Sequence, residues 1–357
     1  MGATYKNNIE LTIFGESHGK AIGITIGNLP SGIQIDLDEV SRDMKRRAPG
    51  QNKMSTARKE ADQVEILSGL QDGITTGAPL TGVIYNSDQH SKDYSLLKTN
   101  MRPGHSDYPA YIKYKGFNDV RGGGHFSGRI TAPIVFAGNI AKQILKQKGI
   151  IGAHILSIGK IKDEKFPVNV DDEMLLKLSE KQYPTIKEDV FEKMEETILK
   201  AKENLDSVGG KIECVALHVP AGVGEPFFDS LESHLSSLMF SIPAVKSVSF
   251  GDGESIDEML GSEANDCYYY DEEGNVRTST NHNGGITGGI TNGMPVSCTV
   301  TFKPTPSIAK KQKTINIETK ENVELEIKGR HDPCIVQRAV VVVEAMMALG
   351  ILDMMRE

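Results

Sequence analysis

Short apolar, β-branched runs recur along the chain and predict a protein rich in strands. The candidate strands are Glu10–Phe14, Ile22–Ile26, Leu80–Tyr85, Glu213–Val219, Val245–Phe250, Val296–Phe302 and Val323–Ile327. Residues 38–47 instead show helical spacing of apolar positions, and this predicted helix ends at Pro49-Gly50 because proline cannot continue it.

Two longer helices are predicted to begin at prolines. The first extends from Pro133 to Lys148, since proline suits the first helical turn and lysine suits the last. The second begins at Pro333, directly after Asp332, a residue type that commonly caps helices. Because this second helix is apolar on nearly all sides, we expect neighbouring elements to cover it.

Residues 171–204 differ from the rest of the chain because they are strongly polar. Their pattern predicts two amphipathic helices with Leu175, Leu178, Val190, Met194 and Ile198 facing inward. We interpret this segment as a peripheral helical insertion between two halves of the chain.

Three sequence segments recur in the same order in those halves. Residues 19–32 resemble 210–222, residues 73–84 match 289–300, and residues 129–135 are similar to 330–336. Such self-similarity indicates an ancient duplication and a pseudo-two-fold molecule. We therefore expect a single domain over residues 1–357, with repeat halves at approximately 1–170 and 205–357 and the helical insertion at approximately 171–204.

Composition and charge exclude several classes of protein. The 357 residues carry a net charge of −8, and 38% of them are hydrophobic, as in globular chains. The acidic balance argues against a general nucleic-acid binder. The most apolar stretch, residues 334–352, contains Gln337, Arg338 and Glu344, so it is expected to form a buried helix and not a membrane span.

The cysteines and the first residues of the sequence indicate in which cellular compartment the protein is expected. The cysteines, at positions 214, 267, 298 and 334, form no C-x-x-C pair, and no metal site is expected. The first residues lack the basic region and apolar run of a signal peptide. A cytoplasmic protein with reduced thiols is the resulting expectation.

One short segment matches a catalytic motif formally. Gly15-Glu16-Ser17-His18-Gly19 is a G-x-S-x-G sequence after a predicted strand, which in α/β-hydrolases raises a nucleophilic serine on a strained turn. Only about fourteen residues precede it, whereas that turn normally follows several strands. A glycine-rich turn without catalytic function is the alternative interpretation.

Arginine- and histidine-containing loops form a second group of candidates. Arg46 and Arg47 end a helix, where they either complement the helix dipole or bind an anion. Arg102 and His105 share one turn, and histidine can act as a general acid near neutral pH. Residues 121–129 contain three consecutive glycines, whose bare backbone suits close approach by a phosphate or a flat ring.

Taken in order, these segments resemble the chorismate synthase family. The shared motifs are GESHG, RR-x-PGQ, DQVEILSG, RPGH-x-DY, RGGG-x-x-S-x-R, AVK-x-V-x-FGDG, NH-x-GGI-x-GGI, KPTPS and GRHDPC-x-V-x-RAV, from Gly15 to about Val340. The ordered combination is specific, although each motif alone is not. The resemblance implies an α+β fold, a β-α-β sandwich with helices between antiparallel sheets and an internal duplication.

The resemblance also implies an activity and its requirements. Family members are carbon–oxygen lyases acting on phosphates, in the seventh step of the shikimate pathway. They remove phosphate and the C6 pro-R hydrogen from 5-enolpyruvylshikimate 3-phosphate by anti 1,4-elimination, which yields chorismate. The implied cofactor is reduced FMN, with NADPH only as an indirect source of reducing equivalents. A homotetramer and an external flavin reductase are the implied partners.

Roles for individual residues follow from the resemblance. His18 is expected to protonate the departing phosphate, and His105 to protonate the reduced flavin. Ser17 and Asp332 are linked to proton removal at C6. The residues implied to bind the anionic substrate are Arg47, Lys53, Arg102, Arg129 and Arg330. The residues implied to contact FMN are His125, Phe126, Ser127, Pro243, Ala244, Gly288, Lys303, Pro304, Thr305, Pro306, Ser307 and Arg330.

Two departures from the family pattern and two alternative functions stay open. Many members have Arg-Ser where this chain has His125-Phe126, and many have arginine in place of Lys53. A serine hydrolase using Ser17 would not account for the arginine motifs. A non-catalytic polyanion binder would leave the histidines without a role.

Overall fold

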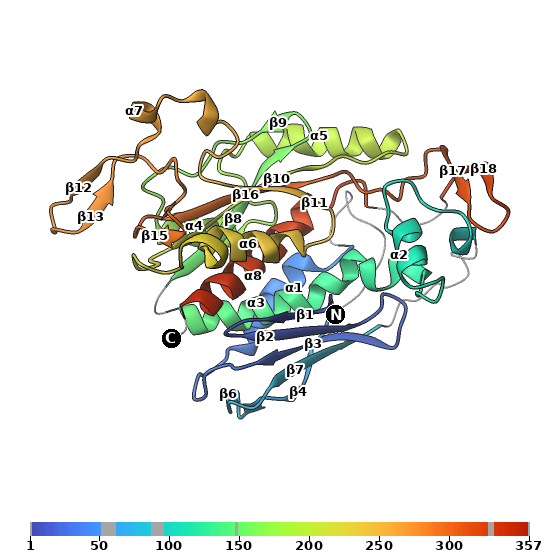
Figure 1. The fold of residues 1–357 in the computed structure, drawn as a ribbon, viewed down its shortest axis with the longest axis horizontal. Coiled ribbons are helices and arrows are strands. Elements are labelled where there is room, and N and C mark those ends of the chain that lie inside the picture. The colour runs from blue at the N-terminus through green and yellow to red at the C-terminus, as the bar shows by residue number, and fades with distance from the viewer. Residues whose placement is uncertain (1, 51–61, 87–95, 147–148, 328–331, 356–357) are drawn as a thin grey trace. The chain divides into compact units, whose positions relative to one another are not determined.

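The computed structural model describes residues 2–50, 62–86, 96–146, 149–327 and 332–355 (Figure 1). The chain forms two compact units, each assembled from three segments. Unit 1 comprises Met1–Phe136, Lys193–Gly209 and Pro304–Arg338. Unit 2 comprises Ala137–Glu192, Gly210–Lys303 and Ala339–Glu357.

Unit 1 is built on a five-stranded antiparallel sheet with the order β1-β2-β3-β7-β4 (Figure 1). Its strands are β1 (Thr4–Lys6), β2 (Glu10–Gly15), β3 (Ala21–Gly27), β4 (Glu65–Ser68) and β7 (Leu80–Tyr85). The strands predicted at β2, β3 and β7 are confirmed, with bounds that agree to within one residue. Their short apolar, β-branched runs were sufficient to predict them.

Packing on this sheet uses a bare glycine. The ring of Phe136, which is completely buried, lies against Gly82 of β7, where a Cβ atom would stand 2.4 Å from its Cε1 atom.

Helix α1 (Leu37–Arg47) is capped by Asp36, whose carboxylate accepts hydrogen bonds from the backbone of Asp38 and Glu39. The helix ends as predicted and begins one residue earlier, and it brings Arg47 into the interior.

The other elements of unit 1 are short. They are β5 (Leu70–Gln71) paired with β6 (Ile74–Thr75), β17 (Gln312–Asn316) paired with β18 (Glu321–Leu325), helix α2 (Asp107–Lys113), and 3₁₀ turns at Leu96–Lys98, Arg121–Phe126 and Gly128–Ile130. The strand predicted at Val323–Ile327 is β18, shifted by two residues.

Unit 2 is built on a second five-stranded antiparallel sheet, with the order β11-β16-β10-β8-β9 (Figure 1). Its strands are β8 (Ile150–Ile158), β9 (Ile161–Lys162), β10 (Gly210–Leu217), β11 (Val245–Phe250) and β16 (Val296–Phe302). The predicted strands at β10, β11 and β16 are confirmed. No strand was predicted at β8, because Gly152, Ala153 and His154 interrupt its β-branched run.

The helices of unit 2 cover apolar surface. Helix α4 (Asp172–Glu180) places Leu175 against Gly152 of β8, and α6 (Leu231–Phe240) packs near β11. Helix α5 (Val190–Glu203) continues from unit 2 into unit 1. All five residues predicted to face inward from the polar segment are buried: Leu175, Leu178, Val190, Met194 and Ile198.

The two longest helices approach each other closely. Helix α3 (Thr131–Leu145) and helix α8 (Val336–Met354) meet at Gly138, where a Cβ atom would stand 2.1 Å from that of Ala345. Helix α8 is buried as expected, but it begins at Val336 and not at Pro333. Asp332 therefore lies four residues before the helix, and its carboxylate pairs with Arg338.

The remaining elements of unit 2 are small. They are the hairpins β12 (Tyr268–Tyr270) with β13 (Val276–Thr278) and β14 (Ile286–Thr287) with β15 (Ile290–Thr291), the short helix α7 (Gly261–Ala264), and 3₁₀ turns at Phe227–Asp229 and Ile256–Glu258. Within the described ranges, no helix is both long and apolar enough to cross a membrane.

The repeated sequence segments form corresponding elements. The first pair forms β3 and β10, the second forms β7 and β16, and the third leads into α3 and α8. β3 pairs with β7, and β10 pairs with β16, in both cases antiparallel. The α+β class is therefore confirmed, while the single domain with its two halves stays a prediction.

Candidate active site

Unit 1 brings two glycine-containing segments of the sequence together. The backbone N–H of Ser17, in the turn after β2, donates a hydrogen bond to the carbonyl of Gly124 over 3.1 Å. Nδ1 of His125 lies 2.8 Å from the carbonyl oxygen of Gly15. Ser17 and His18 are each only 3% exposed. The GESHG turn is thereby attached to the triple-glycine loop.

The triple-glycine loop contacts both predicted catalytic histidines. Gly122 and Gly123 have φ values of 60° and 86°, which L-residues rarely adopt. A Cβ atom on Gly122 would stand 2.2 Å from the His18 ring and 2.8 Å from Oγ of Ser17. A Cβ atom on Gly123 would stand 3.3 Å from Nε2 of His105. The glycines are therefore required for the close approach of these side chains to adjacent backbone positions.

The Ser17 hydroxyl gives no support to a serine hydrolase. Its Oγ atom is buried and has no hydrogen-bond partner among the residues that the structure describes. A nucleophilic serine is activated by a base within hydrogen-bond reach. The buried hydroxyl is instead a polar group that a ligand could satisfy.

A single carboxylate holds Arg102 and His105. Asp107 accepts hydrogen bonds from Nε and Nη2 of Arg102, both over 2.7 Å, and lies 2.6 Å from Nδ1 of His105. Burial works to raise the pKa of Asp107, but the bonds from Arg102 and His105 outweigh it and hold the pKa well below its usual range. Asp107 is therefore ionised and can only accept hydrogen bonds.

A second carboxylate holds two arginines. Asp62 bridges Nη1 of Arg47 and Nη1 of Arg129 through its two oxygens, and all three residues are buried. The pKa of Arg47 is lowered to about 10, mainly by burial; the nearby cations Arg338 and Arg129 contribute to the decrease, and Asp62 opposes it. The pKa of Asp62 is lowered, because its two arginine partners outweigh the opposing effect of burial.

Other polar contacts join these groups. Nε of Arg129 donates to Oδ1 of Asn86 over 2.8 Å, and the Asn86 amide donates to the carbonyls of Glu16 and Gly19. Nη1 of Arg338 binds Asp332 over 2.6 Å, and its Nε donates to the carbonyl of Arg47. The predicted residue Asp332 is thereby connected to the arginine group.

The residues predicted to contact FMN occur in both units. In unit 1, Oγ of Ser307 accepts a hydrogen bond from Nη1 of Arg102 over 3.2 Å. Phe126 is partly exposed, and its ring lies 6.3 Å from that of Tyr114. Oγ1 of Thr305 is buried with no hydrogen-bond partner in the described ranges. These positions connect the KPTPS segment to the Arg102–Asp107–His105 group.

In unit 2, the predicted FMN contacts are divided between two places. Ala244 has a φ of 75°, and its carbonyl accepts a hydrogen bond from the backbone of Lys303 over 3.0 Å. Gly288 lies in the separate β14–β15 turn. Lys53 and Arg330, both predicted to bind substrate, lie outside the described residues.

Sequence reasoning assigned no role to three polar residues of unit 1. Asp62 and Asp107 stand inside the quoted motifs DQVEILSG and RPGH-x-DY, and Asn86 follows the strand β7. Their positions within motifs were the available signal. What the motifs could not indicate is that the carboxylates pair with the arginines and so reduce the positive charge of the site.

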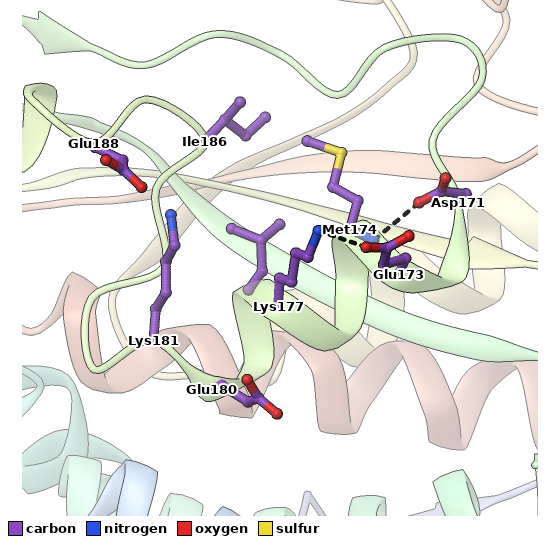
Figure 2. A pocket seen from close by; sticks show the side chains of 9 residues that line it. Asp171, Glu173, Met174, Lys177, Glu180, Lys181, Ile186 and Glu188 are labelled. Carbon is purple, nitrogen blue, oxygen red and sulfur yellow. Dashed lines mark hydrogen bonds and ion pairs between the residues drawn. The ribbon is translucent and has the colours of Figure 1, made fainter.

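A surface pocket in unit 2 involves none of the predicted site residues. It lies over helix α4 and the turn that follows it, and Figure 2 shows its side chains: Asp171, Glu173, Met174, Lys177, Leu178, Glu180, Lys181, Ile186 and Glu188. Lys177 pairs with Glu173, and Lys181 donates to the carbonyl of Thr185. We therefore assign the candidate site to unit 1. The described ranges contain no metal-binding group of His, Cys, Asp or Glu residues.

The fold shows the structural class of this protein. It is an α+β protein whose architecture matches a solved structure titled "Crystal Structure of Chorismate Synthase", with a TM-score of 0.76, 28% identity, and coverage of 97% of this chain and 91% of that one. The family model of chorismate synthase matches residues 9–356. The chorismate synthase of Methanocaldococcus jannaschii is 47% identical over 99% of this chain and 96% of its own length. That of Thermococcus gammatolerans is 46% identical over 97% of this chain and 95% of its own length. The chain belongs to the chorismate synthase family, and it is an enzyme of the lyase class.

Proposed function

We propose that this protein converts 5-enolpyruvylshikimate 3-phosphate to chorismate, in the seventh step of the shikimate pathway, and that it requires reduced FMN. The observation that carries the proposal is the approach of His18 and His105 to adjacent glycines of one loop. Buried arginines accompany both histidines within unit 1. Proton donors and anion-binding groups are the two things that elimination of phosphate requires.

Arginines are proposed to bind the three anionic groups of the substrate. Arg47, Arg102 and Arg129 are 2%, 7% and 5% exposed, so each guanidinium is shielded from bulk water. In such surroundings a guanidinium binds a carboxylate or phosphate more strongly than on the surface, and its fork can bind two oxygens at once. Lys53 and Arg330 are proposed to complete this set.

His18 is proposed to donate a proton to the departing phosphate. Its ring packs directly on the backbone of Gly122, which fixes its orientation. Ser17 precedes it, with a buried hydroxyl available to a ligand. We propose that Ser17 and Asp332 assist proton removal at C6, Asp332 from its position beside Arg338.

His105 is proposed to hold a proton at Nε2. Because the Asp107 carboxylate is ionised, Nδ1 of His105 must donate the hydrogen bond between them. Nε2 is then the atom that faces Gly123 and can exchange a proton with the cofactor. Asp107 thus sets which nitrogen of the ring is used.

The residues present fit a flavin nucleotide. The buried Thr305 hydroxyl, without a partner in the described ranges, can donate to a phosphate or ring oxygen, and Ser307 stands beside Arg102. We propose that FMN is held by 125–127, Pro243-Ala244, Gly288 and 303–307, with Arg330. Reduced FMN, when bound, supplies electron density that no side chain can provide.

We further propose the oligomeric state, the cellular compartment and the source of reduced FMN that the family resemblance implied. The protein would act as a homotetramer in the cytoplasm, with reduced FMN from an external flavin reductase and NADPH only as an indirect source of electrons. Flavin incubated anaerobically with NADPH and this protein alone should stay oxidised. Bleaching at a catalytic rate would contradict the external source.

The first test is phosphate release from 5-enolpyruvylshikimate 3-phosphate under anaerobic conditions, with and without photoreduced FMN. We expect release, together with chorismate absorbance, only when reduced FMN is present. Release without flavin, or no release from folded protein, would refute the proposed reaction.

Substitutions test the histidine roles. His18→Asn and His105→Asn should each lower turnover by about 100-fold or more while the protein stays folded. His218→Asn is the matched control, because His218 is an exposed histidine of unit 2 that pairs with Asp172. Wild-type turnover in either site variant would refute that histidine's role.

A further inference from the structure

Asp62 is the most completely enclosed carboxylate of the candidate site. Its side chain has no solvent exposure, and it stands just before β4, where the described residues 62–64 form no helix or strand. One oxygen accepts from Nη1 of Arg47, and the other accepts from Nη1 of Arg129. Both carboxylate oxygens are therefore used by arginines that come from different elements.

The electrostatic surroundings explain why a carboxylate is needed there. Arg47 and Arg129 are both buried, and each lies close enough to Asp62 to form an ion pair. Two buried guanidinium groups repel each other, and removal from water destabilises both. Asp62 offsets these effects, and the group of three still carries a net positive charge. An anion is therefore still attracted to the pair.

The hydrogen bonds also fix the planes of the two guanidinium groups. Arg47 is held at Nη1 by Asp62 and at Nε by Oγ1 of Thr131, over 3.3 Å. Arg129 is held at Nη1 by Asp62 and at Nε by Asn86. Each planar group is thus fixed at two of its nitrogen atoms, so neither can rotate independently. Such preorganisation reduces the entropy lost when a ligand binds.

From this geometry we infer that Asp62 is a positioning residue, which holds Arg47 and Arg129 as one receptor for an oxyanion group, of the phosphate or carboxylate class. Asp62 itself does not contact the ligand. This inference rests on the proposed function, because it assigns these arginines to the substrate. It predicts that Asp62 acts on ligand affinity far more than on the chemical step.

The test compares Asp62→Asn with the wild-type enzyme and with Asp43→Asn. The amide side chain would keep the shape of the carboxylate but place an N–H group against an arginine donor. Asp43 is the matched control, because it is a buried carboxylate of α1 that pairs over 3.0 Å with Arg46, outside the proposed receptor. We expect Asp62→Asn to raise KM for 5-enolpyruvylshikimate 3-phosphate by about 10- to 100-fold, with kcat changed by less than about threefold. Asp43→Asn should change neither.

A second variant distinguishes weakened binding from misfolding. Asp62→Glu keeps the charge and moves the carboxylate by one methylene, so it should fold while still weakening binding. Thermal unfolding of both variants checks that they are native at the assay temperature. An unchanged KM in folded variants would overturn the inference. A lower KM would also overturn it, since Asp62 would then compete with the substrate and not position its receptor.

Binding of inorganic phosphate, measured by calorimetry, separates this inference from the proposed reaction. If the wild-type protein fails to turn over but binds phosphate in a manner that Asp62→Asn weakens about tenfold, the reaction is refuted and the role of Asp62 stands. If turnover occurs and neither KM nor phosphate affinity depends on Asp62, only the present inference fails. Absence of both turnover and phosphate binding would overturn both.

Discussion

Each unit contains a buried cluster of charged residues, and the two clusters differ in what their carboxylates hold. In unit 1, Asp62 binds two arginines, and Asp107 binds Arg102 and His105, whose ring lies beside the glycine loop. In unit 2, His154 is completely buried between Asp163, 3.2 Å from Nδ1, and Glu213, 2.9 Å from Nε2. Perturbed titration alone would mark both as candidate sites.

The partners of the unit 2 carboxylates indicate a structural role. Asp163 also accepts from the backbone of Ile186 and Lys187, and Glu213 accepts from the backbone of Phe166. The Phe166 ring closes the cluster edge-on, 4.6 Å from the imidazole. These bonds attach the chain after β8 to the sheet. The comparison shows a difference in partners: the unit 1 carboxylates hold mainly arginine and histidine side chains, with one backbone bond from Arg102 to Asp107, whereas those of unit 2 accept three backbone N–H groups besides His154.

The largest expected effect is a loss of stability when the unit 2 cluster is disrupted, which tests whether that cluster is structural. His154→Leu should lower the free energy of unfolding by about 3–5 kcal/mol, because two buried carboxylates lose the group between them. Turnover per folded molecule should stay near the wild-type value. Urea denaturation and an active-site-normalised assay would measure both. A loss of turnover in protein shown to be folded would break the distinction between the clusters.

A smaller effect is expected on turnover when a side chain is added to the glycine loop. Gly122→Ala should lower turnover by about 100-fold, because its Cβ atom would displace the His18 ring. Gly128→Ala is the control, since a Cβ atom there meets nothing within 4 Å. Steady-state kinetics of the two variants test the prediction. Equal turnover in both would show that the loop does not position His18.

Asp107 and His154 should respond to pH in opposite directions, although Asp163 of the second cluster follows Asp107 because its pKa is lowered as well. The lowered pKa of Asp107 means that its contribution to stability is complete above about pH 4 and is lost as the pH falls toward its folded-state value. Burial works to lower the pKa of His154, but its bonds to Asp163 and Glu213 raise it overall. Its contribution is therefore complete below about pH 6.5 and is lost as the pH rises through its folded-state value.

Denaturant unfolding as a function of pH measures these contributions. Asp107→Asn should flatten the acid side of the stability profile, and His154→Gln should flatten the alkaline side, each by about 1–3 kcal/mol. If the pH–stability profiles of the variants stay parallel to that of the wild type, Asp107 does not determine the acid side and His154 does not determine the alkaline side.

The smallest effect is expected at a solvent-exposed ion pair. Asp119 binds Arg121 over 2.7 Å, but nearly half of the Arg121 side chain is exposed. Asp119→Asn should therefore change stability by less than about 1 kcal/mol, as is usual for surface pairs. Thermal unfolding beside Asp107→Asn would measure the contrast, and a loss as large as for Asp107 would show that burial is not the deciding factor.

Much of the fold was predictable because local patterns determine it. β7, β11 and β16 have the predicted bounds, since their residues are β-branched and turn residues limit them. β8 was missed, because Gly152, Ala153 and His154 interrupt its β-branched residues. The start of α8 was predicted three residues early, because Asp332 suits a helix cap but forms an ion pair with Arg338.

The sequence by itself determined the family, the main strands and helices, and the kinds of side chain available for chemistry. Only the tertiary structure decided how those side chains are paired. Asp62 lies 15 residues from Arg47 and 67 from Arg129, and no local pattern relates such distant positions. A buried charge must find a partner wherever the fold brings one within reach, so the packing of separate elements, and not the spacing of a motif, selects which carboxylate holds which arginine.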